Sequence, residues 1–162
     1  MKTGHAIVLL MVCIPTLSLA QLLNEAEPLP DITTSGQPDE SALVQLAEKG
    51  FVTVIDLRAE NEDRGFREAD AVENLGMRYV SLPISGPDAV NYENAEALDS
   101  FLSSAKGPVL IHCASSNRVG ALLSLRQRLV GDDADAALAT GLKAGLSSPV
   151  LREVVEARLA ER

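Results

Sequence analysis

Short apolar runs alternate along this chain with longer segments whose apolar positions recur every three or four residues. The runs at 51–58, 77–83 and 109–113 are bounded by glycine or proline, which is typical of buried strands. Residues 31–38 have a shorter pattern that predicts a strand followed by a turn. Between these runs the spacing of the apolar residues is typical of helices that bury one face.

The helical spacing is accompanied by residues that begin and end helices. Asp39 and Glu40 suit the positive end of a first helix, Gly50 suits its end, and Asn94 suits the start of a later one. Strands that alternate with helices favour an α/β fold with a mostly parallel central sheet flanked by helices. We expect helices at about 38–50, 68–75, 94–105, 118–130, 132–143 and 148–160.

The first twenty residues differ from the rest of the chain. Lys2 precedes an apolar run at 6–17, and small residues at 18–20 resemble a cleavage site. This arrangement is typical of a secretory signal peptide. A membrane anchor is the alternative, but a run of this length interrupted by Pro15 is too short to span a bilayer. We therefore expect an exported protein, periplasmic or secreted, with no membrane span in the mature chain.

Cleavage after residue 20 would leave an extended lead-in at 21–30 and a single domain over 31–162. The formal net charge of the whole chain is −9, and Lys2 is the only charged residue of the first twenty, so the mature chain would carry −10. An acidic chain of this kind argues against a nucleic-acid partner, which requires a basic face. The sequence does not indicate the oligomeric state.

Residues 109–120 carry the clearest chemical signal. A buried strand runs into His112 and Cys113, four small or polar residues follow, and Arg118 begins a helical pattern. A loop that enters a helix N-terminus directs several backbone N–H groups to one point, which favours an anion. The helix dipole and a guanidinium also favour the nucleophilic thiolate of a cysteine. We call residues 113–118 the cysteine loop; its substrate-binding candidates are Ala114, Ser115, Ser116, Asn117 and Arg118.

Cysteine and histidine are both scarce. Removal of the leader would take Cys13 and leave Cys113 as a single thiol without a disulfide partner. A reactive thiol is our hypothesis, and a buried inert thiol is the alternative. His112 has only His5 as a companion in the sequence, which is too few soft ligands for a zinc site. We predict neither a metal nor a cofactor.

The segment from His112 through Arg118 resembles the signature loop of cysteine-dependent phosphatases of the tyrosine and dual-specificity type. Within that superfamily, the four-residue spacing is similar to that of the bacterial phosphatase-like domain found with beta-lactamase-hydrolase-like proteins. The order of motifs supports this resemblance over residues 31–130, and we extend it to about residue 146. The resemblance implies a cysteine-phosphatase-like fold in which His112 lies behind the loop in a supporting role.

The same resemblance implies a general acid from the loop after the third predicted strand. Asp88 in the segment 83–88 is the candidate, and Glu93 is the reserve. The charged segment at 59–70 is interpreted as a solvated loop or helix face. The alternative is that Arg58, Arg64 or Arg67 lines the approach to an anionic substrate.

Three departures from the usual phosphatase pattern leave the reaction open. The cysteine loop is one residue short, Ser116 stands where glycine is usual, and Val119 stands where serine or threonine is usual. If residue 116 requires a positive φ, serine costs about 1 kcal/mol there. A shorter loop is also similar to that of the rhodanese sulfurtransferases.

The sequence therefore supports three hypotheses about function. The first is an exported hydrolase of phosphomonoesters with Cys113, Arg118 and Asp88 as catalytic residues. The second is sulfur transfer through a Cys113 persulfide, and the third is an anion-binding protein that has lost efficient catalysis. The expected partner is a phosphorylated or sulfur-containing small molecule or peptide.

Overall fold

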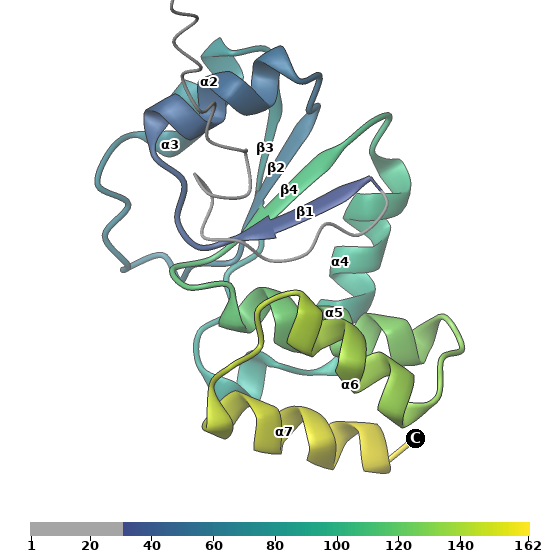
Figure 1. Cartoon of the computed structure of the whole chain (residues 1–162). Coiled ribbons are helices and arrows are strands. Elements are labelled where there is room, and N and C mark those ends of the chain that lie inside the picture. Colours follow the sequence, from purple (N-terminus) through teal and green to yellow (C-terminus); the bar gives the residue numbers. More distant parts are fainter. Residues whose placement is uncertain (1–30) are drawn as a thin grey trace, which may run out of the picture.

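A sheet of four parallel strands forms the centre of the molecule (Figure 1). The computed structural model describes residues 31–162, so the predicted signal peptide and lead-in lie outside the described part. The strand order is β1-β4-β2-β3. The strands are β1 (Ile32–Ser35), β2 (Thr53–Asp56), β3 (Arg78–Ser81) and β4 (Val109–His112).

Helices cover both faces of this sheet (Figure 1). One face packs against α2 (Glu40–Glu48) and α3 (Glu68–Asn74), and the other packs against α4 (Tyr92–Ser104) and α5 (Asn117–Leu129). Beyond α5 lie α6 (Ala134–Lys143) and α7 (Pro149–Ala160). The predicted α/β architecture is confirmed. Among residues 31–162, no helix is long and apolar enough to cross a bilayer.

The side chains of the central strands alternate between the two cores. Val54 and Leu110 pack into the cluster beneath α2 and α3, whereas Ile55 and Ile111 pack into the larger cluster against α4 and α5. All four are fully buried. Burial on both faces explains why these strands are continuously apolar in sequence rather than alternating.

Most predicted helix starts are correct, and one is wrong. Asp39, Asp133 and Ser148 cap α2, α6 and α7 through their side chains. The start of α4, however, is capped by Asn91, whose side chain accepts a hydrogen bond of 2.9 Å from the backbone N–H of Asn94. Asn94 lies in the first turn instead, so the sequence placed this start about one turn too late.

Two glycines bring α6 against α5 at backbone distance. A Cβ atom on Gly120 would lie 2.4 Å from the carbonyl oxygen of Gly141, and one on Gly141 would lie 1.9 Å from Ser124 Oγ. Neither position accepts a larger side chain without separating the helices. This close approach places the turn between α6 and α7 beside the start of α5, where the cysteine loop ends.

A buried network of charged side chains lies at the carboxyl ends of β2 and β4. Asp56, Arg58, Glu68 and His112 all have fully buried side chains. Arg58 donates to Asp56 Oδ1 from Nε and to Oδ2 from Nη2, both at 2.9 Å, and it also donates to Glu68. Tyr79 donates to Asp56 at 2.7 Å. The prediction of a solvated segment at 59–70 is therefore wrong for Glu68, which is buried.

The guanidinium of Arg58 supplies the positive charge in this network. Oxygen and nitrogen ligands of Asp56, Glu68 and His112 lie within 4.8 Å of one another, a spacing that suits a metal ion. Because Arg58 bonds to both carboxylates and Arg64 Nε lies 3.3 Å from Asp56 Oδ2, two protein cations face these two acids. Burial alone raises the pKa of the Asp56 carboxyl, but hydrogen bonds from Arg58 and Tyr79 contribute to an opposing effect that lowers it to about 2.

We predict that the fold loses stability as the pH falls from about 4 to about 2. The folded pKa of Asp56 is about 2, below its ordinary value of 3.8, so its contribution is complete above pH 4 and is lost on protonation. A shift of this size corresponds to about 2 kcal/mol. Urea unfolding at a series of pH values measures it.

Asp99 supplies the control for that experiment because its carboxylate forms a more exposed pair with Arg126 at 2.8 Å. Asp99→Asn should leave the acid dependence of stability nearly unchanged. A free energy of unfolding that stays constant between pH 4 and pH 2 in the unmodified chain would contradict the prediction.

Candidate active site at the carboxyl end of strand β4

The cysteine loop begins where β4 ends and is held there by the segment that follows β1. The backbone N–H of Cys113 donates to the carbonyl of Ser35 at 3.4 Å, and that of Gln37 donates to Ala114 at 3.3 Å. A Cβ atom on Gly36 would lie 3.0 Å from the Ala114 carbonyl oxygen. A small residue at position 36 therefore allows the two segments to touch.

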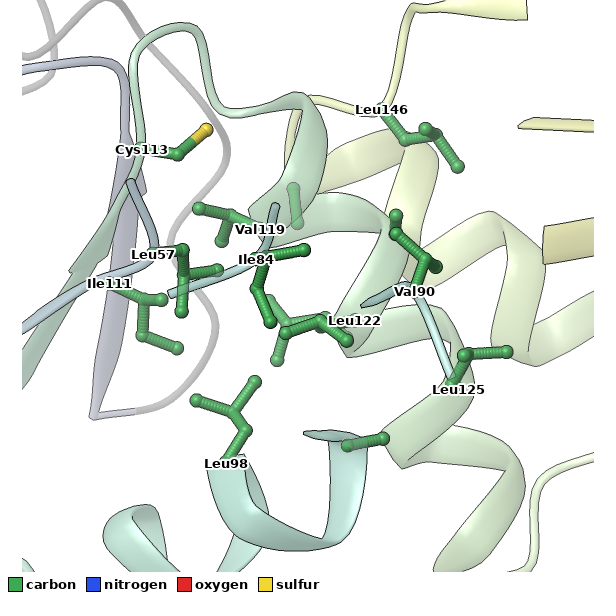
Figure 2. Close-up of a cluster of buried hydrophobic side chains, with 14 of the residues drawn as sticks. Leu57, Ile84, Val90, Leu98, Ile111, Cys113, Val119, Leu122, Leu125 and Leu146 are labelled. Carbon is green, nitrogen blue, oxygen red and sulfur yellow. The ribbon is translucent and has the colours of Figure 1, made fainter. Parts of the chain in front are cut away.

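Cys113 is a free and fully buried thiol. Figure 2 shows its sulfur at the edge of the large apolar cluster, pointing into the curve of the chain between β4 and α5. Val119 and Leu57 belong to the same cluster. A buried thiol is also what we would expect if Cys113 were inert. The hypothesis of a reactive thiol therefore depends on the charged group beside it.

That group is Arg118, in the first turn of α5. Its pKa is raised, mainly by hydrogen bonding to Glu62 and further by its proximity to Cys113. Arg118 Nη2 donates to Glu62 Oε2 at 2.7 Å, Nη1 donates to Oε1, and Nη1 also reaches the Ile84 carbonyl at 3.3 Å. Glu62 and the Ile84 carbonyl thus fix the guanidinium, and the effect of Cys113 on its pKa indicates that the thiol is near it.

Glu62 is a site residue that the sequence did not indicate. Its Oε1 accepts a hydrogen bond of 2.6 Å from the backbone N–H of Ala59, and the pairing with Arg118 lowers the pKa of its carboxyl. In sequence it is one acid within a charged run, 56 positions before Arg118. No local pattern separates it from a solvated glutamate.

The arginines that were alternatives for the substrate approach have other partners. Arg58 is fully buried on Asp56 and Glu68, so the hypothesis that it lines the approach is wrong. Arg64 contacts Asp56 at 3.3 Å, and the exposed Arg67 pairs with Asp70.

Ser116 adopts the left-handed backbone conformation that the sequence analysis considered, with φ of 62°. Its hydroxyl donates to the carbonyl of Ala144 at 2.8 Å, in the turn between α6 and α7. A Cβ atom on Gly145 would lie 2.6 Å from Ser116 Cβ. The serine side chain thus occupies space that Gly145 leaves open, and its hydrogen bond offsets part of the strain.

Asn117 joins the cysteine loop to α7. Its Oδ1 accepts hydrogen bonds from the backbone N–H of Ser147 at 2.8 Å and of Ser148 at 2.5 Å. Its Nδ2 donates to the Ser115 carbonyl at 3.3 Å. The side chain of Asn117 is therefore engaged in fixing the start of α7, whereas the prediction concerned its backbone N–H group.

A cavity of about 380 Å³ opens over the loop. Among the predicted binding residues, Ser115, Asn117 and Arg118 line this cavity. Ser116 is buried, and Ala114 is exposed but does not belong to the lining. The sequence did not predict the wall formed by α7. The complete lining is Gly86, Ser115, Asn117, Arg118, Ser148 and Leu151.

The candidate acid Asp88 lies in the short 3-10 helix η1 (Pro87–Ala89), two residues after the cavity-lining Gly86. It is exposed, and its carboxylate has no hydrogen-bond partner among residues 31–162. Glu93, the reserve, is exposed in the first turn of α4. Asp88 is therefore on the segment that borders the cavity, and its role stays a prediction.

We predict that Ser116 and Gly145 are energetically coupled. Gly145→Ala should lower the free energy of unfolding by about 1–3 kcal/mol, because it adds strain at φ of 104° and a clash with Ser116. In a Ser116→Gly background the clash disappears and the cost should be smaller. A double-mutant cycle that measures the free energy of unfolding in urea gives the difference. If Gly145→Ala costs the same free energy in both backgrounds, the two residues are not coupled.

Comparison with known proteins agrees with this geometry. The family "Beta-lactamase hydrolase-like protein, phosphatase-like domain" matches residues 28–130. A beta-lactamase hydrolase-like protein of Agrobacterium fabrum is 31% identical over 104 residues, and one from Xylella fastidiosa is 26% identical over the same length. The match covers 62% of this chain but only 24% of each relative, so the chain spans about a quarter of their length.

Solved structures share the fold at low sequence identity. A Neisseria meningitidis protein provisionally described as a phosphatase has a TM-score of 0.69 at 20% identity, with 82% of this chain and 96% of that chain covered. P. aeruginosa TpbA, crystallised in complex with pTyr, has a TM-score of 0.63 at 20% identity, with 83% of this chain and 87% of that chain covered. The fold is thus that of the cysteine-dependent phosphatases, and the chain belongs to the phosphatase-like domain family of the beta-lactamase hydrolase-like proteins.

Proposed function

We propose that this chain is an exported cysteine-dependent hydrolase of phosphomonoesters. The observation that carries the proposal is the guanidinium of Arg118 held beside the Cys113 thiol at the N-terminus of α5. A cation and a helix N-terminus together favour both a thiolate and a bound phosphate. The phosphatase fold supports this chemistry, and Arg118, but not the buried Cys113, lines the cavity over the loop. The location rests on the leader sequence alone.

In the proposed reaction the thiolate of Cys113 attacks phosphorus, forming an S–P bond as the P–O bond to the leaving group breaks. Asp88 gives its proton to the leaving oxygen. Arg118 and the loop amides stabilise the charge on the equatorial oxygens in the transition state. Water then attacks phosphorus and gives a proton to the Asp88 carboxylate, the S–P bond breaks, and phosphate leaves as the thiolate is restored.

Sulfur transfer is the second candidate, favoured by the four-residue loop. Cys113 would attack the outer sulfur of thiosulfate, take it as a persulfide and release sulfite. A thiol acceptor would then remove that sulfur. Only one atom has to fit beside the loop amides, and Asp88 has no part in the reaction.

Intact mass after brief incubation separates these chemistries. With an aryl phosphate, we expect phosphate release that Cys113→Ser abolishes, and no added sulfur after thiosulfate treatment. A gain of one sulfur at Cys113 without phosphate release would replace the proposal with sulfur transfer. Anion binding without turnover in either assay would indicate a protein that has lost catalysis.

Asp88→Asn tests the acid in the same assay. We expect kcat for substrates with poor leaving groups to fall about 100-fold, because a general acid contributes rate on that order. Glu93→Gln is the matched control and should change little. If Glu93→Gln lowers kcat and Asp88→Asn changes little, Glu93 is the acid and Asp88 is not.

We also predict that Glu62→Gln lowers kcat/KM about tenfold. The variant keeps the shape of the side chain but loses one charge-assisted hydrogen bond to Arg118. Asp63→Asn changes an adjacent acid and serves as the control, since within residues 31–162 its carboxylate accepts a hydrogen bond from Gly65 alone. Equal activity of the Glu62 variant and the unmodified chain would remove Glu62 from the site.

A further inference from the structure

The carboxylate of Glu68 lies between two buried groups at the back of the cysteine loop. Its side chain, at the first position of α3, is fully buried. One oxygen, Oε2, accepts a hydrogen bond from Arg58 Nη2. The other, Oε1, lies 2.7 Å from His112 Nε2, and neither of these two buried atoms has another hydrogen-bond partner or a hydrogen bond of ordinary geometry to the other among residues 31–162.

The groups that face His112 from other elements are farther away or already engaged. Asp56 of β2 is 3.9 Å from His112 Nε2, and its oxygens accept from Arg58 and Tyr79. Arg64 also pairs with Asp56. From β1, the residue in register with His112 is the neutral Ser35. Within the described residues, Glu68 is thus the acid within hydrogen-bond distance of the ring.

A buried carboxylate oxygen needs a donor, because leaving it without one costs more than a typical hydrogen bond contributes. In the described part of the chain, the nitrogen that lies within hydrogen-bond distance of Oε1 is His112 Nε2, at 2.7 Å. An imidazole nitrogen donates only when it carries a proton. The carboxylate therefore favours the form of His112 that is protonated on Nε2.

We propose that Glu68 is a positioning residue that fixes the tautomer and orientation of His112, the residue directly before the nucleophile. Only the kinetic consequence rests on the proposed hydrolase function. The assignment of the tautomer rests on the geometry of Glu68 and His112 alone.

The orientation of the His112 ring influences the position of Cys113 through the backbone that joins the two residues. The ring of His112 lies among the charged groups near α3, whereas the Cys113 side chain belongs to the apolar cluster against α5. The carbonyl of His112 also accepts a hydrogen bond of 2.9 Å from Leu57. With the ring and the carbonyl both held, the direction in which Cys113 leaves β4 is fixed, and small errors in such placement cost large factors in rate.

Glu68→Gln gives a specific test because the two ends of an amide differ. Arg58 needs an acceptor, so the amide oxygen should take the Oε2 position and leave the NH2 group facing His112 Nε2. Nε2 must then accept, and the proton should move to Nδ1. Nitrogen NMR of histidine-labelled full-length chain reports the tautomer directly, and a His5→Gln variant separates the signals of the two histidines.

We expect the neutral ring of His112 to carry its proton on Nε2 in the unmodified chain and on Nδ1 in Glu68→Gln. In the hydrolase assay, kcat should fall at least about tenfold with KM changed less than about twofold. Asp70→Asn is the matched control, since it converts another acid of α3 that pairs with Arg67 at the surface. It should change neither the tautomer nor kcat.

A proton on Nδ1 in the unmodified chain would overturn the proposal, even if Glu68→Gln failed to fold. So would a folded Glu68→Gln chain that kept both the original tautomer and the original kcat. If the unmodified chain has no phosphatase activity, the hydrolase proposal fails, and the tautomer measurement still decides the role of Glu68.

Discussion

The buried guanidinium of Arg58 is the interaction on which the site depends. A charge removed from water must be paired and hydrogen-bonded, and here Asp56 and Glu68 both bond to it. Asp56 also accepts from the backbone N–H of Arg58 at 2.9 Å, which fixes the turn that follows β2. The segment from Arg58 to Glu68 is thereby attached to the sheet at both of its ends.

This attachment matters because the same segment contacts Arg118, at the end of the cysteine loop, and His112, directly before its start. Near its start, Ala59 donates to Glu62, which holds Arg118. At its end, Glu68 lies against His112. The nucleophile and the cationic group thus take their positions from one stretch of chain that carries neither of them.

The far side of the loop depends on close helix packing. Contact between α5 and α6 at Gly120 and Gly141 brings the next turn to Ser116, and Gly145 leaves room for the serine side chain. A serine at a positive φ is unusual, and here the missing Cβ of a residue distant in sequence accommodates it. The departure from the family pattern at position 116 therefore has a structural explanation.

The sequence by itself determined the α/β fold, the strand β4 and the cysteine loop with Cys113 and Arg118, because apolar spacing and the signature motif are local patterns. The start of α4 was nevertheless predicted at the wrong residue. Asn91 and Asn94 both suit a helix cap, and the sequence alone does not distinguish them. Only the tertiary structure identified Glu62, Glu68 and the wall formed by α7. Their roles arise from contacts between distant segments, which no local pattern distinguishes from ordinary surface charge or helix packing.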